Sequence, residues 1–181
     1  ANLLVGISYG WWQSKHTRHH GNPNKVGYDP DFAPGVLAFT PEQAQRSEHP
    51  LVRWLVPHQG WYFFPLLLLE GLSLHWEGIH RVAGRRRVDR RWVELAFLTT
   101  RLAGLPVLLL LVMSPVKVVA VLAVQLALFG LYMGLSFAPN HIGMPLVAPG
   151  LKLDFLNRQV LMSRNISGGR WMSVLLGGLN H

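Results

Sequence analysis

Residues 117–138 read KVVAVLAVQLALFGLYMGLSFA, an apolar stretch in which Gln125 is the only polar residue of the central part. A helix needs roughly 20 such residues to cross the hydrocarbon layer of a bilayer. Residues 94–113 form a second stretch of this length, with Arg101 near its start. Half of the 181 residues are hydrophobic and only 14% are charged. We therefore expect an all-α integral membrane protein in which these two stretches are transmembrane helices.

The link between the two stretches, residues 114–117, predicts a tight transmembrane hairpin and carries one positive charge. The residues just before the hairpin include six arginines: Arg81, Arg85, Arg86, Arg87, Arg90 and Arg91. Because cytoplasmic loops are rich in Lys and Arg, we expect the arginines to face the cytoplasm and the hairpin tip to face outward. The net charge of +8 comes without aromatic interleaving or a nucleic-acid fold, so nucleic acid is not expected as a partner.

A third apolar stretch, residues 51–74, differs from the other two because it contains Pro57, Pro65 and Glu70. If the histidines before it and the arginines after it both face the cytoplasm, this stretch cannot cross the membrane once. We expect an interfacial segment, a re-entrant segment or two half-length passes here. The alternative, a crossing that places the arginines outside, is disfavoured by the charge distribution.

Shorter elements surround these stretches. Gly, Asn, Asp and Pro dominate residues 21–35 and predict an irregular loop. Thr40-Pro41-Glu42-Gln43 predicts the start of a short helix that ends before Pro50. An amphipathic helix is expected over residues 152–164, followed by an apolar run over residues 171–176.

Three of the nine histidines, His16, His19 and His20, fall within five residues. On a helix these offsets place all three on one face, and converging neutral imidazoles typically bind a metal. The chain has no cysteine, so a metal here would be bound through nitrogen or oxygen. His141 follows the second predicted span and would return to the same side of the membrane. The competing interpretation is a solvated basic patch.

The remaining histidines have weaker claims. His49 is expected in a solvated loop and His58 in a structural role. His75 and His80 flank Glu77 near the membrane edge, where interfacial polar residues are the commoner explanation. His181 ends the sequence, and its role stays open.

The histidine motifs resemble those of the integral-membrane fatty acid desaturases, in particular the front-end acyl-CoA and acyl-lipid enzymes. The second histidine box, HxxHH, is matched by KHTRHHGNPN at 15–24, with Asp29-Pro30-Asp31 after it. Phe137-Ala138-Pro139-Asn140-His141 is similar to the Asn-His segment after the last span. Gln159-Val160, residues 163–165 and Gly177-Gly178-Leu179-Asn180 resemble the approach to the third box. The first box and the HH pair of the third are absent, so we expect an internal fragment that is inactive alone.

The resemblance implies a single, partial desaturase domain over residues 1–181. It implies two iron ions, with His16, His19, His20 and His141 each binding one of them. The implied reaction uses O2 to introduce a double bond into the acyl chain of an acyl-CoA or a phospholipid. It also implies a separate electron donor of the ferredoxin or cytochrome b5 type, contact with membrane lipids, and histidine boxes on the cytoplasmic face of a multi-pass protein.

Two other functions remain open from the sequence. A related di-iron acyl or alkane hydroxylase would use similar histidine boxes but would insert oxygen instead of removing two hydrogens. A non-catalytic membrane protein would use the histidines to bind zinc. The sequence does not define the double-bond position, the acyl carrier or the oligomeric state.

Overall fold

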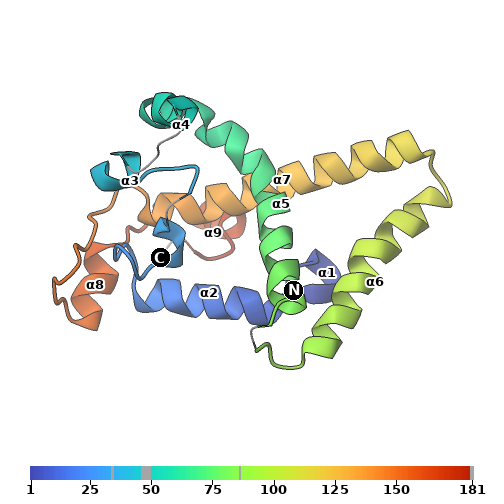
Figure 1. Ribbon diagram of the computed structural model, residues 1–181, viewed down its shortest axis with the longest axis horizontal. Helices are drawn as coiled ribbons and strands as arrows, with labels where there is room; N and C mark the ends of the chain where they lie inside the picture. The colour runs from blue at the N-terminus through green and yellow to red at the C-terminus, as the bar shows by residue number, and fades with distance from the viewer. Residues whose placement is uncertain (34, 46–49, 86, 180–181) are drawn as a thin grey trace. The chain divides into compact units, whose positions relative to one another are not determined.

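The computed structural model describes residues 1–33, 35–45, 50–85 and 87–179, and within these ranges the chain is helical and contains no strand (Figure 1). The elements are α1 (Asn2–Val5), α2 (Tyr9–Gly21), η1 (Pro30–Phe32), α3 (Pro41–Gln45), α4 (Pro50–Leu55), η2 (Val56–His58), α5 (Gln59–Ala83), α6 (Arg91–Leu110), α7 (Pro115–His141), α8 (Phe155–Leu161) and α9 (Gly169–Leu175). The expected all-α fold class is confirmed.

The chain forms two compact units. The first comprises Ala1–His16 and Leu67–Gly134, and the second comprises Thr17–Leu66 and Leu135–His181. Helices α2, α5 and α7 each contribute residues to both units. The expectation that residues 1–181 belong to one partial domain stays a prediction.

Helices α6 and α7 are the two helices of the described residues that are long and apolar enough to cross a membrane. They match the two predicted spans, whereas α5 does not meet the same criterion. Large apolar side chains on both helices are exposed, among them Val107, Leu108 and Val119. A soluble core helix would bury such side chains, so their exposure is consistent with contact to lipid.

The connection between α6 and α7 is formed by residues 111–114, slightly earlier than the predicted link at 114–117. Pro115 is the first residue of α7, and Ser114 precedes it, with its carbonyl accepting from the Val118 amide at 3.0 Å. Proline suits this position because the first amides of a helix lack intrahelical partners. The helix therefore begins at the proline that the sequence had assigned to the link.

In the first unit, α5 and α7 cross with their backbones in direct contact at Gly71 and Gly130. A Cβ atom at Gly71 would overlap the carbonyl oxygen of Leu126, and one at Gly130 would overlap the Gly71 nitrogen and the Leu67 carbonyl. Glycine is required on both helices for this approach. Close by, Ile7, Trp11 and Leu74 form the buried core of the unit.

The start of α2 is held by Glu94 from the first turn of α6. The Ser8 hydroxyl donates to Glu94 Oε2 at 2.5 Å and accepts from the Trp11 amide at 3.1 Å. Glu94 Oε1 accepts from the Gly10 amide at 2.8 Å. Ser8 thus acts as the N-cap of α2, and Glu94 provides a second acceptor for the free amides of the first turn.

In the second unit, the short helix predicted at Thr40 is α3. Thr40 Oγ1 accepts from the Gln43 amide at 3.2 Å, and Gln43 Oε1 accepts from the Phe39 amide at 2.7 Å. The helix expected over 152–164 is shorter, because Asp154 caps α8 by accepting from the Asn157 amide at 3.0 Å. The apolar run near the end forms α9.

Candidate metal centre

Helix α2 contains the histidine cluster, as the metal interpretation requires. His16 belongs to the first unit, where its ring stacks on Trp12 with 5.0 Å between ring centroids. His19 and His20 belong to the second unit, in which His19 is buried and His20 is exposed at the helix surface. The three histidines share one helix but have different surroundings.

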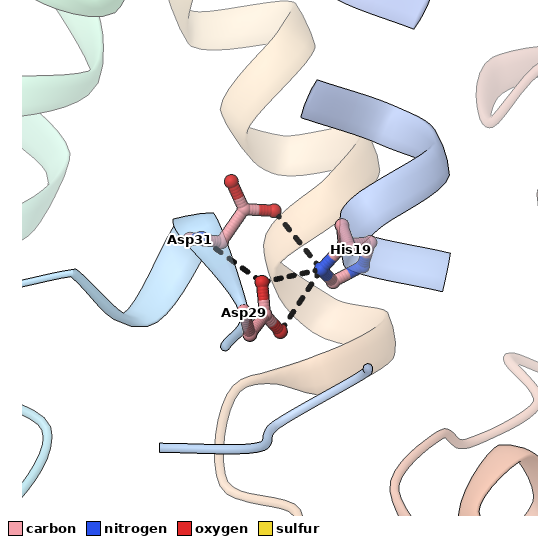
Figure 2. A group of neighbouring side chains, drawn as sticks. All are labelled: His19, Asp29 and Asp31. Atoms are coloured by element: carbon pink, nitrogen blue, oxygen red, sulfur yellow. Dashed lines mark hydrogen bonds and ion pairs between the residues drawn. The ribbon is translucent and has the colours of Figure 1, made fainter. Parts of the chain in front are cut away.

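His19 is held by two carboxylates from the loop that follows α2. Its Nδ1 lies 2.9 Å from Oδ1 and 3.0 Å from Oδ2 of Asp29, and 3.2 Å from Oδ2 of Asp31. Figure 2 shows the three side chains pointing toward one another, with the two aspartates on the same side of the imidazole. Because carboxylates accept hydrogen bonds, Nδ1 carries the proton and the lone pair of the neutral ring is on Nε2.

The loop places Asp29 at this position through local hydrogen bonds. Asp29 caps the 3-10 helix η1 by accepting from the Asp31 amide at 2.9 Å, and it also accepts from the Asn24 amide at 2.8 Å. Both carboxylate oxygens therefore accept hydrogen bonds, and the residue is 2% exposed. Pro30 at the start of η1 favours this turn, since its fixed φ suits the first helical position.

His141 ends α7, and its ring is oriented in a similar way. Its Nδ1 lies 3.1 Å from the carbonyl oxygen of Met162, which can only accept a hydrogen bond. The neutral ring therefore carries its proton on Nδ1 and its lone pair on Nε2, as in His19. Metal-binding histidines usually donate their second ring N–H to a carboxylate or a backbone carbonyl, and both histidines show this pattern.

The rings of His19, His20 and His141 are grouped together in the second unit. The His19 centroid is 4.5 Å from that of His141, with the rings nearly perpendicular at 89°, and 5.4 Å from that of His20. Two imidazoles that share one ion, each with its nitrogen about 2 Å from the metal, have ring centres roughly 4.5–5.5 Å apart when they meet near a right angle. The spacing of the three rings therefore fits a metal site.

Electrostatics favour the neutral form of His20. Partial desolvation of its ring, followed by the proximity of His19 and His141, lowers the pKa of His20 below its ordinary value. Asp31 and Asp29 oppose this effect more weakly. A neutral imidazole is the form that binds a metal, so the local charges support this role.

The residues His19, Asp29 and Asp31 are close enough together to hold a metal ion as a group of their own. The hydrogen bonds support a different role for Asp29, because its oxygens already accept from His19 and from two backbone amides. It orients the histidine instead of competing with it for a metal. In the sequence, Asp29 and Asp31 follow the histidine box directly, but the motif alone indicated no role for them.

The other histidines differ from this group. Both ring nitrogens of His75 face carbonyl oxygens, with Nδ1 2.6 Å from Gly71 O and Nε2 3.1 Å from Val5 O, so neither faces a metal. His58 is exposed and contacts the carbonyl of Trp54 at 2.9 Å, in agreement with a structural role. His80 is exposed and packs its ring against Trp76. His49 and His181 lie outside the described residues.

Comparison with known proteins connects this site to a family. The family model described as fatty acid desaturase matches residues 1–181. The chain belongs to the fatty acid desaturase family. Membership supports an iron centre in general terms, and the apolar helices α6 and α7 agree with the membrane character of this family.

Several desaturases are similar to nearly the whole chain. The acyl-lipid (7-3)-desaturase of Diacronema lutheri is 32% identical over 99% of this chain and 44% of its own length. The Delta(8)-fatty-acid desaturase of Helianthus annuus is 24% identical over 98% of this chain and 41% of its own length. The acyl-lipid (8-3)-desaturase of Rebecca salina is 26% identical over 99% of this chain and 42% of its own length. The chain thus spans about two-fifths of these desaturases, and no solved structure matches it.

Proposed function

We propose that this chain is the part of an O2-dependent acyl-lipid or acyl-CoA desaturase that binds iron through His16, His19, His20 and His141. The observation that carries the proposal is the shared orientation of His19 and His141, because the Nδ1 of each ring faces an acceptor and the lone pair of the neutral ring is therefore on Nε2. Two iron ions need about twice as many ligands as these four residues provide. We expect the others to come from further segments of the full-length protein.

When bound, the iron centre would supply the oxidising power that removes two hydrogens from an unactivated acyl chain, with O2 as oxidant. The residues of this chain have separate tasks in that chemistry. His19 and His141 provide neutral nitrogens, and Asp29 and the Met162 carbonyl fix the orientation of the two rings. The electrons would come from a separate ferredoxin or cytochrome b5-type donor.

The membrane setting fits an apolar substrate. We propose that α6 and α7 cross the bilayer as a hairpin, with the histidines and the arginines of residues 81–91 on the cytoplasmic side. Arg85, Arg87 and Arg90 are exposed, as expected for a polar loop at a membrane surface. The acyl chain of the substrate would then approach the metal from the lipid phase.

The test uses the full-length protein that contains this chain, expressed in a host that lacks the activity and supplied with candidate acyl lipids. Mass spectrometry of the fatty acids should show a loss of two hydrogens. His19→Ala and His141→Ala should each abolish the product and lower the iron content of the purified protein. His58→Ala is the matched control, because His58 is exposed and contacts the ring and carbonyl of Trp54, and it should retain both iron and product.

The same measurements distinguish the other functions. A gain of one oxygen in the product, instead of a loss of two hydrogens, would identify a hydroxylase. Zinc without iron in the purified protein, together with unchanged lipids, would identify a non-catalytic zinc protein and would contradict the proposal.

A further inference from the structure

Asn24 lies in the loop after α2 and is completely buried, with 0% of its surface exposed. Its backbone adopts φ +54°, in the left-handed region that few residues other than Gly, Asn and Asp adopt readily. The side chain also lowers the stability of the fold, because its Oδ1 is buried and accepts no hydrogen bond from the described residues. A buried acceptor without a donor disfavours folding, so general stability is a poor explanation for this side chain.

The amide group of Asn24 reaches the segment that follows α7. Its Nδ2 lies 3.1 Å from the carbonyl oxygen of His141, 3.4 Å from that of Met144 and 3.2 Å from that of Pro145. The backbone adds two further bonds, from the Val147 amide to the Asn24 carbonyl at 2.9 Å and from the Val26 amide to the Val147 carbonyl at 3.1 Å. One side of Asn24 is thus attached to the segment that begins at His141.

The other side of Asn24 is attached to His19. The Asn24 amide N–H donates to Oδ2 of Asp29 at 2.8 Å, and the same carboxylate accepts from Nδ1 of His19 at 2.9–3.0 Å. The two candidate ligands are 122 positions apart in the sequence (141 − 19), yet only two buried residues, Asp29 and Asn24, connect them in this chain of contacts.

We propose that Asn24 is a positioning residue that fixes the His141 segment against the His19–Asp29 pair. The proposal rests on the proposed function, because it assigns the two histidines to one metal site. It follows that the separation of the two rings, 4.5 Å between centroids, is set before a metal binds. Such preorganisation raises metal affinity, since fewer groups need to be ordered during binding.

Two variants of the full-length protein distinguish the contribution of the Asn24 side chain from that of the Asn24 backbone. Asn24→Gly keeps the left-handed backbone and the N–H to Asp29 but removes the amide group. Asn24→Asp keeps the shape but directs carboxylate oxygens at three carbonyl oxygens. The matched control is Asn22→Ala in the same loop, which removes one exposed hydrogen bond, from Nδ2 to the Arg18 carbonyl at 3.2 Å.

The first readout is hydrogen exchange of the metal-free protein, measured by mass spectrometry on peptides that cover residues 141–147. We expect exchange in this segment to be about tenfold faster or more in both Asn24 variants, and unchanged in Asn22→Ala. Peptides from α6 report on general unfolding and should keep the wild-type rate. The second readout is iron affinity, which should fall about 10- to 100-fold in the Asn24 variants, the range typical for residues that orient metal ligands.

Wild-type exchange over residues 141–147 in Asn24→Gly would overturn the inference, and so would an equal increase in the α6 peptides. If the wild-type protein binds no iron, the proposed function fails instead. In that case, the exchange experiment still decides whether Asn24 fixes the His141 segment.

Discussion

Asp29 shows how much of the candidate site depends on a single side chain. Its two oxygens accept from the His19 ring and from the Asn24 and Asp31 amides, and all of these partners lie within residues 19–31, at the end of α2 and in the segment that follows it. The carboxylate thereby orients the imidazole and closes the loop at the same time. Loss of the Asp29 charge should therefore affect both the orientation of His19 and the stability of the loop.

We predict that Asp29→Asn lowers the iron affinity of the full-length protein about 10- to 100-fold, because an amide orients His19 less well than a carboxylate does. It should also lower the free energy of unfolding by about 1–3 kcal/mol, since buried donors lose their acceptor. Metal analysis and denaturant unfolding would measure the two effects. Asp89→Asn is the control, because the Asp89 side chain is 94% exposed and its ion pair with Arg87 is long, at 3.9 Å. Unchanged iron affinity in Asp29→Asn would contradict the assigned role.

At the scale of single residues, the sequence indicates candidate ligands, which stay predictions, but it does not indicate their hydrogen-bond partners. The 16, 19, 20 spacing predicts that the three histidines share one helix, which α2 confirms, but helical periodicity says nothing about which residue meets Nδ1 of each ring. The partner of His19 depends on the left-handed turn at Asn24, and the partner of His141 is a backbone carbonyl at Met162, which has no sequence signature. By contrast, His16 and Trp12 are four residues apart on α2, so helical geometry alone brings their rings together.

Among the elements, the contact between α5 and α7 is the most sensitive to sequence. We predict that Gly71→Ala and Gly130→Ala each destabilise the full-length protein by about 1–3 kcal/mol, because a methyl group would force two backbones apart. Gly60→Ala in α5 and Gly104→Ala in α6 are matched controls, since an added Cβ meets nothing within 4 Å at either position. Thermal unfolding in detergent should show a lower Tm for the first pair only. Equal Tm values for all four variants would show that the helices do not approach at these glycines.

The helices that could be predicted are those with strong local signals. The two long apolar stretches and the Thr40–Gln43 cap all formed as expected. The errors are at helix ends, where one hydrogen-bonding side chain decides the boundary. Asp154 starts α8 later than the amphipathic pattern predicted. Pro115 starts α7 two residues before the apolar stretch predicted at 117–138.

On the scale of the whole molecule, the proposed topology is a hairpin whose tip faces away from the histidines. We predict opposite labelling of two single-cysteine variants of the full-length protein, made in a background without other cysteines. Ser114→Cys, at the exposed tip, should react with an impermeant maleimide in intact cells, whereas Tyr28→Cys, in the exposed loop after the histidine box, should react only after permeabilisation. Labelling of both variants from the same side would contradict the hairpin.

The glycine contact between α5 and α7 also restricts how a lipid could move. Where two backbones touch, no gap remains that is wide enough for a hydrocarbon chain, so the helices are sealed to each other at the level of Gly71 and Gly130. If the proposed function holds, no acyl chain can pass between these two helices at this level. The two glycines would then exclude hydrocarbon from this part of the interface between α5 and α7.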